Sequence, residues 1–519
     1  MKFSYGVGKM IRCQSILKYK SYQEYAKDEV ARISREISPV QSVAPQKGTL
    51  RDLAIDGDGI AFINTLEKWL QSGVDVEPND WALYAKICVD EGEPARLLAT
   101  AQKLDCGVWQ IGRFRTYLFI AALMAHEYAM ARRLAAETLS GYATNKRFLL
   151  RIVGESYLLQ DAEITKAAIS QLISHFRQEL SRSELIYLYN TALYDVGESF
   201  FWGIAEPNSI RKKDQNTLIF QSNVARRRDD YLGQVRYYNA LLDRYGLTRV
   251  VLIDENQPLS VVNVRAESPS GPLHGPLVTV LMSSFNSSAT IISALEALTY
   301  QSYRNLEILV ADDCSTDDTV EKVRRYADER DDRVRVYQMN VNGGTYRARN
   351  YGLANATGTY FTCLDSDDWA HPQRIATLVE FLETSPSHIA ARSHLLRLSV
   401  TNGFKPHVAG YIHEDMSSLL FRREEVIEKV GYYRPVRTGA DSEFIERLSV
   451  AFGAEAMGVI SKPLLLADWT ESSLSGSPIT GITRGGTMSS GRLRFRSEFR
   501  REHRAGRLHV PLDDRAMEG

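Results

Sequence analysis

The stretch from residue 277 to residue 364 alternates short apolar segments with helical segments, and this alternation constrains the fold most. Apolar runs of a few residues that are rich in branched side chains favour buried strands. The segments are Leu277–Met282, Leu306–Ala311, Val334–Tyr337 and Gly358–Leu364. Strands that alternate with helices are joined by right-handed crossovers, and they form a mainly parallel sheet that binds ligands beyond the carboxyl ends of its strands.

Acidic residues follow two of these predicted strands. Asp312 and Asp313 come after the second strand, and the fourth strand leads into Asp365, Asp367 and Asp368. Alternate residues of an extended chain point to the same side, so carboxylates spaced in this way can face one divalent cation. The pattern favours chemistry on a nucleotide diphosphate donor. The alternative is that the acidic residues only cap the helix that follows.

At these residues the chain resembles the GT-A nucleotide-sugar glycosyltransferases, specifically the inverting glycosyltransferase family 2. The matching motifs are Val280–Asn286, Val310–Asp317, Asn342–Gly344 with Ala348–Asn350, and Leu364–Asp368. The resemblance implies an α/β fold, a GT-A (Rossmann-like) catalytic domain with a mainly parallel sheet. The chain departs from the family at Ser283 and Ser284, where proline and threonine are frequent.

The same resemblance implies an activity. We expect a metal-dependent inverting glycosyltransferase that moves a sugar from a nucleotide-diphosphate sugar, with a UDP-sugar as the expected donor. The expected acceptor is a hydroxyl of a glycan or of a lipid-linked molecule, in polysaccharide or glycoconjugate biosynthesis. A nucleotidyltransferase of similar fold is the weaker alternative, because its first loop would be rich in glycine and lysine, and residues 283–288 contain neither.

Roles for single residues at the donor site also follow from the resemblance. The expected nucleotide-sugar-binding residues are Ser283, Phe285, Asn286, Asp312, Asp313, Arg349, Asp365 and Ser366. Asp367 is the expected direct ligand of Mn²⁺ or Mg²⁺, and Asp365 is expected to ligate the metal, a metal-bound water or the ribose. A divalent cation there would offset the charge of the departing diphosphate. Whether Phe285 stacks on the base or packs in the core stays open.

An inverting transfer also needs a general base, which takes the proton of the acceptor hydroxyl. The resemblance places this base on a helix after the acceptor-side strand, and residues 438–444 match part of that region. Asp441 is therefore the expected base. Glu443 is its competitor, but side chains two positions apart on a helix point about 200° apart, so only one of them can face the site. A role for Asp441 as a helix cap stays open.

The first half of the chain has a different pattern. Three segments with small residues recur at spacings of 36 and 34 residues, counted from Ala95 to Ala131 and from Ala131 to Thr165. This period is typical of stacked helical hairpins. It resembles tetratricopeptide repeats but lacks their full consensus. Such a stack can bind a partner protein or form a dimer, and the alternative that it only braces the catalytic domain stays open.

Changes in composition predict the domain boundaries. Residues 266–276 contain three prolines and two glycines, as a linker would. The C-terminal segment combines arginines with Leu493, Phe495 and Phe499, which favours either peripheral contact with an anionic membrane or packing on the protein body. The predicted parts are a poorly defined leader (1–50), a helical accessory domain (51–265), a linker (266–276), a GT-A domain (277–480) and a basic amphipathic tail (481–519).

Charge and composition argue against other classes of protein. The 63 basic and 64 acidic residues give a net charge of −1, so the chain has no general attraction to nucleic acid. It has neither a signal-type N-terminus nor an apolar run of about 18 residues, so we expect a cytoplasmic protein that can be peripheral at the inner face of the membrane. A catalytically inactive, transferase-like protein that acts through its helical repeats is the alternative function. Intact Asp365, Asp367 and Asp441 argue against it.

Overall fold

The computed structural model describes residues 58–72, 76–104, 106–109, 111–141, 145–205, 214–267, 273–470, 473 and 480–513. The predicted leader and residues 268–272 of the predicted linker lie outside the described residues. The chain folds into two compact units. We call them the helical unit (Met1–Ser181, Thr191–Trp202 and Ser472–Gly506) and the sheet unit (Arg182–Asn190, Gly203–Glu471 and Arg507–Gly519).

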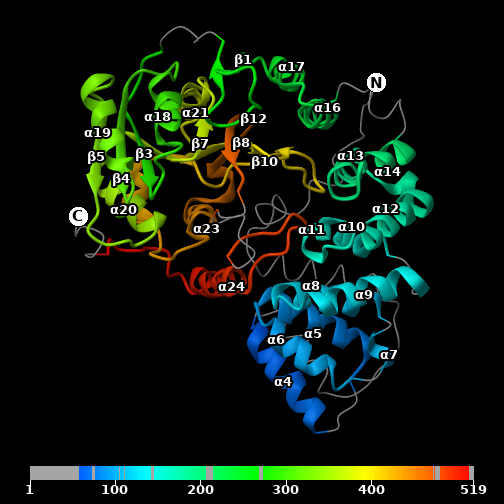
Figure 1. The fold of residues 1–519 in the computed structure, drawn as a ribbon. Helices are drawn as coiled ribbons and strands as arrows, with labels where there is room; N and C mark the ends of the chain where they lie inside the picture. Colours follow the sequence, from blue (N-terminus) through cyan, green and yellow to red (C-terminus); the bar gives the residue numbers. More distant parts are fainter. Residues whose placement is uncertain are drawn as a thin grey trace, which may run out of the picture. The chain divides into compact units, whose positions relative to one another are not determined.

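The helical unit is a succession of short helices packed on one another (Figure 1). They are α4 (Gly59–Gln71), α5 (Pro78–Asp90), α6 (Pro94–Ala101), α7 (Cys106–Trp109), α8 (Gly112–Met124), α9 (Tyr128–Gly141), α10 (Lys146–Gly154), α11 (Ser156–Leu159), α12 (Ala162–Phe176), α14 (Glu198–Ile204) and α24 (Ser490–Arg504). Helix α5 packs against α8, α8 against α9, and α9 against α12. Buried small residues such as Ala131, Ala135 and Ala168 allow this close approach. A helical domain before the α/β domain is thus confirmed, and its relation to tetratricopeptide repeats stays a prediction.

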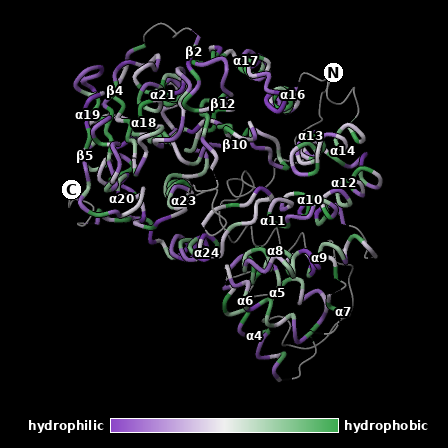
Figure 2. Tube along the Cα trace, in the orientation of Figure 1, coloured by the Kyte–Doolittle hydropathy of each residue, from purple (hydrophilic) through white to green (hydrophobic). Residues whose placement is uncertain are grey.

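The C-terminal helix α24 belongs to the helical unit and packs against α5. Its Arg494 Nε donates to the Gly92 carbonyl at 3.1 Å and lies 3.2 Å from Glu93, and Ser497 donates to Glu91. Leu493 and Phe499 are buried, although most of the residues of this helix are hydrophilic (Figure 2). Packing on the protein body, one of our two alternatives for this segment, is therefore observed, and membrane contact stays a prediction. Across the described part of the chain, no helix has the length and apolarity to cross a membrane.

The sheet unit is built around a ten-stranded sheet with the strand order β5-β4-β3-β6-β11-β8-β12-β7, and β9 and β10 also pair with β8. The strands are β3 (Val278–Ser284), β4 (Leu306–Asp312), β5 (Val334–Gln338), β6 (Tyr360–Asp365), β7 (Asp368–Ala370), β8 (Ala390–Ser399), β9 (Gly403–Phe404), β10 (Ile412–Glu414), β11 (Leu420–Arg422) and β12 (Met457–Asp468). The four predicted strands are β3 to β6, which pair in parallel as expected. The second half of the sheet is mixed, because β11 runs antiparallel to β6 and β8.

Helices cover this sheet and carry two of the predicted site residues. They are α18 (Ile291–Thr299), α19 (Thr319–Glu329), α20 (Thr345–Asn355), α21 (Arg374–Thr384), α22 (Arg423–Val430) and α23 (Ala440–Phe452). Helices α20 and α23 share one apolar core with the central strands, in which Leu353 and Phe444 pack with Leu281, Leu309 and Phe361. This core fixes the starts of α20 and α23, and therefore Arg349 and Asp441, relative to the strands.

The register of the parallel strands brings the predicted donor loops together. Ser283 lies opposite Asp365, and Ser284 lies opposite Asp312. All seven positions of β3 and all seven of β4 are buried, as expected for strands covered on both faces. Thr279 and Glu307, near the amino ends, bond to each other, and the remaining polar side chains of these strands lie at their carboxyl ends, where the chain leaves the sheet.

Helices α13 (Arg182–Thr191), α16 (Gln215–Arg227) and α17 (Tyr231–Arg244) pack with the sheet unit, together with the short strands β1 (Val250–Val251) and β2 (Arg265–Ala266). The sequence assigned residues 51–265 to the helical domain, so this grouping differs from that boundary. The reason is a set of contacts between residues far apart in the chain. Asn223 Nδ2 donates to the Phe404 carbonyl at 2.7 Å, and the Phe404 amide donates to Asn223 Oδ1 at 2.7 Å. The rings of Tyr238 and Phe404 lie 5.2 Å apart.

The Asn223 contacts predict a stability effect. Asn223→Ala leaves the buried amide and carbonyl of Phe404 without partners, so we expect the free energy of unfolding to fall by about 3 kcal/mol. Asn305→Ala is the matched control, because Asn305 is exposed and donates to one backbone carbonyl, that of Gly275; it should cost less than about 1 kcal/mol. Urea unfolding of both variants measures this. Equal losses of unfolding free energy in the two variants would show that the contacts of Asn223 with Phe404 do not stabilise the sheet unit.

Candidate active site at the carboxyl edge of the sheet

Serine and asparagine side chains join the loop after β3 to its neighbours. Ser283 Oγ lies 2.7 Å from the hydroxyl of Thr345 at the start of α20, and Ser284 Oγ donates to Asp312 at 3.0 Å. Asn286 has a left-handed backbone (φ 49°), and its side-chain oxygen accepts from the amide of Thr316 at 2.8 Å. Ser283 and Asn286 thus hold the donor loops in place.

Phe285 lies in the same loop with its side chain outward. It is 49% exposed, which excludes the core packing that the sequence left open. An exposed ring at the edge of a ligand-binding sheet is free to contact a planar ligand.

The two acidic residues after β4 brace loops. Asp312 is fully buried and accepts hydrogen bonds from Ser284 Oγ and from the amide and hydroxyl of Ser315. Asp313 accepts from the amides of Gly343 and Gly344, both at 2.7 Å. Burial raises the pKa of Asp313, against the effect of these two amides. The two carboxylates that were predicted to hold the nucleotide therefore hold protein loops, and their contact with a nucleotide stays a prediction.

Arg349 lies buried on α20 and points at the end of β6. Its Nη2 donates to Asp365 Oδ1 at 2.8 Å, and its guanidinium carbon lies 5.4 Å and 6.0 Å from the ring centroids of Tyr346 and Tyr433. Burial opposes the charge of Arg349, but Asp365 outweighs it, and the pKa of Arg349 is raised well above its ordinary value. The buried Nε of Arg349 has no hydrogen-bond partner. Asp365 is thereby oriented while it stays partly open, with 34% of its side chain exposed.

Four carboxylates gather where β6, β7 and β12 meet. Asp365 ends β6, Asp367 follows, and Asp368 begins β7 and accepts from the Asp468 amide at 3.0 Å. Ser366 Oγ lies 2.7 Å from the hydroxyl of Ser287, which ties this turn to the loop after β3. Loss of hydration, followed by the charges of Asp365 and Asp468, raises the pKa of Asp367 to about 7. Burial and the neighbouring aspartates also raise the pKa of Asp368 well above its ordinary value.

Sequence reasoning missed Asp468. It lies about a hundred residues after the metal motif in the chain, and only the antiparallel pairing of β12 with β7 brings it there. The apolar run from Leu464 to Ala467 that ends in an aspartate repeats the pattern of β6 and was the available signal.

The aspartates of this group are possible ligands of a divalent cation. Within the described ranges, no group of three or more His, Cys, Asp and Glu side chains is arranged to hold a metal by itself. Magnesium-type sites often use one or two carboxylates together with the phosphates of the substrate, and hard oxygen ligands suit Mg²⁺ and Mn²⁺. Burial and, after it, repulsion from Asp365 and Asp468 raise the pKa of Asp367, and a cation would relieve that repulsion. Asp367 and Asp365 therefore fit a cation that is shared with a phosphate-bearing ligand.

Asp441 and Glu443 face different surroundings on α23. Asp441 is half-buried in the first turn, where its Oδ1 accepts from the Ser442 amide at 2.7 Å, and the cap position itself is Gly439. Glu443 is fully buried and pairs with Arg447 at 2.9 Å and with Arg434 at 3.1 Å. The helix geometry thus turns Glu443 into the protein. Asp441 stays partly accessible. Its negative charge contributes, after burial, to the raised pKa of Tyr433, the residue whose ring lies beside Arg349.

The ion pairs of Glu443 predict a structural role for that residue. Glu443→Gln removes the charge that compensates the buried guanidinium of Arg447, so we expect the free energy of unfolding to fall by about 4 kcal/mol. Asp441→Asn should change it by less than about 1 kcal/mol, because this side chain has no buried charge partner. Chemical denaturation distinguishes the two. A stable Glu443→Gln variant would contradict the structural role.

Comparison with known proteins agrees with this geometry. Residues 279–443 match the family model described as glycosyl transferase family 2. The putative glycosyltransferase EpsE of Bacillus subtilis is 37% identical over 109 residues, which are 21% of this chain and 39% of EpsE. WfaP of Escherichia coli, named as a UDP-Glc:alpha-D-GlcNAc-diphosphoundecaprenol beta-1,3-glucosyltransferase, is 35% identical over 108 residues, 21% of this chain and 42% of WfaP. The chain thus spans about two fifths of the length of each of these relatives.

Solved structures give a weaker likeness. The crystal structure of S. aureus TarS 1-349 in complex with UDP-GlcNAc is 20% identical and covers 38% of this chain and 60% of that chain, with a TM-score of 0.31. A TM-score this low bears neither on the fold nor on the function.

Proposed function

From the premise that residues 279–443 are a glycosyl transferase family 2 domain, we propose that the protein is a metal-dependent inverting glycosyltransferase. The observation that carries this proposal is the pairing of buried Arg349 with Asp365 at the edge where β3, β4 and β6 end, next to the carboxylate of Asp367. This arrangement offers positive and negative groups in the positions that a nucleotide diphosphate and its cation require.

The donor is a nucleotide-diphosphate sugar that lies over the carboxyl edge of the sheet. Phe285 offers an exposed ring to the base, and Asp313 holds the Gly343–Gly344 turn beneath it. Gly344 has φ +88°, a backbone conformation that side chains other than glycine disfavour. We favour UDP as the nucleotide, in keeping with the name of the relative WfaP.

Asp367 and Asp365 would hold the divalent cation, Mn²⁺ or Mg²⁺. A cation in this position acts as a Lewis acid that stabilises the charge on the departing diphosphate. Arg349 orients Asp365, because its own buried charge needs that carboxylate. Asp367 binds the cation in its deprotonated form.

Asp441 is the proposed general base. Its carboxylate is half-buried at the start of α23, and it takes the proton of the acceptor hydroxyl as the oxygen attacks the sugar. The proposed acceptor is a glycan or a lipid-linked glycan. The diphosphoundecaprenol acceptor in the name of WfaP supports the second class.

The metal proposal predicts a loss of binding. Asp367→Asn should remove the Mn²⁺-dependent part of UDP affinity, because the amide keeps the shape of the side chain and loses its charge. Asp328→Asn is the control, since Asp328 is an exposed residue of α19 on the same unit. Calorimetric titration of UDP with and without Mn²⁺ measures this. Mn²⁺-dependent binding that survives in Asp367→Asn would remove Asp367 from the site.

The base proposal predicts a loss of turnover without a loss of donor affinity. Asp441→Asn should lower the rate of sugar transfer by roughly 100-fold and leave UDP affinity unchanged. Glu425→Gln on the exposed face of α22 is the control, because Glu443→Gln is expected to destabilise the fold. The measurement is transfer from UDP-sugars to a panel of glycosides. Full turnover in Asp441→Asn would show that another group accepts the proton.

A further inference from the structure

Cationic and imidazole side chains surround one tryptophan beside the acidic edge of the sheet unit. We call this set the basic cluster, and it consists of Arg397, Lys405, His407 and His413 around Trp469. The residues come from β8, the segment after β9, β10 and the residue that follows β12. All five are half-buried, so they are held by the protein and still accessible.

The contacts within the basic cluster are close. Lys405 Nζ lies 2.9 Å from the centroid of the Trp469 ring, and the guanidinium carbon of Arg397 lies 5.3 Å from it. The rings of His407 and His413 lie 5.2 Å apart at 88°. Cations over an indole ring are attracted by its negative face. The tryptophan thus gathers two positive charges at one place.

The backbone holds the basic cluster rigidly. The Lys405 amide donates to the Arg397 carbonyl at 2.8 Å, and the Trp469 amide donates to the Leu398 carbonyl at 2.8 Å. His413 lies opposite Leu395 in the pairing of β10 with β8. A site on paired strands keeps its geometry better than a site on a free loop.

Cationic side chains surround His413. Loss of hydration, followed by the charges of His407, Arg397 and Lys405, lowers the pKa of His413 to about 3. His413 is therefore a neutral hydrogen-bonding group among cations. A negatively charged ligand would be attracted to this position.

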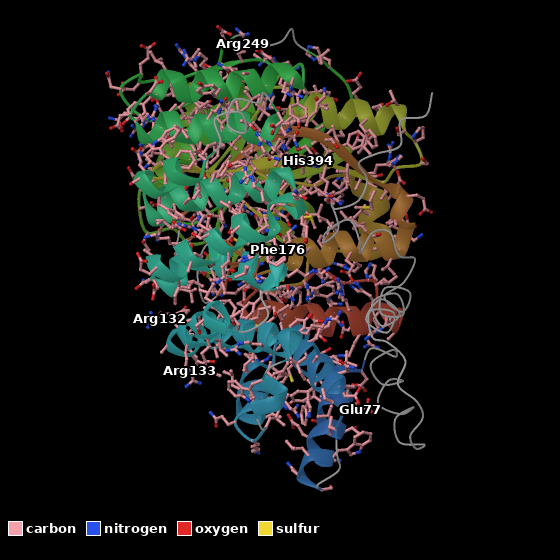
Figure 3. The ribbon with its side chains drawn as sticks, turned by 90° about the vertical axis from the view of Figure 1, so that its right-hand side faces the viewer. Glu77, Arg132, Arg133, Phe176, Arg249 and His394 are labelled. Carbon is pink, nitrogen blue, oxygen red and sulfur yellow. The ribbon has the colours of Figure 1, made fainter. Side chains whose placement is uncertain are left out.

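Strand β8 also carries two buried polar atoms without hydrogen-bond partners in the described part of the chain. Arg392 on β8 uses Nε and Nη2 to bind Glu414 at 3.0 Å and 2.6 Å, while its buried Nη1 has no hydrogen-bond partner. The buried hydroxyl of Ser393 has none either. His394, the next residue on β8, lies within the strands of the sheet unit (Figure 3), and its charge acts on His413.

The basic cluster adjoins the proposed metal site. The positive charge of Arg397 partly offsets the effects that raise the pKa of Asp367 and of Asp368. In the sequence, Trp469 directly follows Asp468. The donor diphosphate and its cation are expected near the ends of β3, β4 and β6. The basic cluster lies on the other part of the sheet, near β8 and β12.

We propose that the basic cluster is a subsite for an anionic group, a carboxylate or a phosphate ester, on the acceptor sugar. This inference rests on the proposed transferase function and names the chemical class of its acceptor. Trp469 holds the two cations together, and Arg397 and Lys405 bind the anion. The competing explanation is that these cations bind the diphosphate of the donor.

The test uses the full chain, saturated with UDP and Mn²⁺, and calorimetric titration of three probes. Methyl glucuronide carries a carboxylate, glucose monophosphate carries a phosphate, and methyl glucoside is neutral. We expect at least one anionic probe to bind about 10-fold more tightly than the neutral probe, and the tighter of the two identifies the acceptor's anion. Added salt should weaken only the anionic probes.

Two variants and one control test whether the basic cluster causes the preference for an anionic probe. Arg397→Gln and Lys405→Gln should each abolish the preference for an anionic probe and leave UDP affinity unchanged. Arg324→Gln, on the exposed face of α19, should keep the preference. The comparison of the three probes uses the unsubstituted protein. It therefore remains a test even if one of the variants fails to fold.

Contrary results are distinguishable. Equal affinities for all three probes, or a preference that survives in both variants, would overturn the subsite while UDP binding upheld the proposed function. A loss of UDP affinity in Lys405→Gln that matches its loss of probe affinity would assign the cations to the donor and also overturn the subsite. Failure of the unsubstituted protein to bind any of UDP, GDP, CDP and ADP would overturn both.

Discussion

The buried ion pair between Arg349 and Asp365 is the interaction on which the proposed site depends. A guanidinium that is 3% exposed needs a carboxylate, since a buried charge without a partner costs several kcal/mol. The pair therefore ties α20 to the end of β6 and sets the direction of Asp365. It also places the rings of Tyr346 and Tyr433 against Arg349, and Tyr433 is the residue on which the charge of Asp441 acts. One pair thus relates the proposed metal site to the proposed base.

The polar groups of the edge divide into those that hold the protein and those that are open to a ligand. Asp312, Asp313 and Glu443 are buried, and protein donors satisfy them. Asp367 and Asp441 are only half-buried. Loss of hydration and the neighbouring carboxylates raise the pKa of Asp367, a feature that tends to accompany functional sites. Burial and hydrogen bonding therefore separate structural from reactive carboxylates, although all of them are the same residue types in the sequence.

Local patterns predicted much of this site. Strands β3 to β6 follow the predicted segments closely, because alternating apolar runs and helices leave few other folds, and the spacing of Asp365 and Asp367 is visible in the sequence. Contacts between distant residues could not be predicted. Asp468 reaches the metal motif through the pairing of β12 with β7, and Asn223 binds Phe404, 181 residues away. The repeat period also ends before α16 and α17, so the sequence had no signal that these helices pack with the sheet. The bracing role of Asp313 likewise depends on the folded Gly343–Gly344 turn.

The central claim is that the carboxyl edge of the sheet binds a nucleoside diphosphate together with a divalent cation. Calorimetric titration of the full chain with UDP, GDP, CDP and ADP, each with and without Mn²⁺, tests it most directly. The account predicts that one diphosphate binds best and that Mn²⁺ strengthens its binding at least about 10-fold. Absence of binding for all four nucleotides, or an affinity that does not respond to the metal, would contradict it.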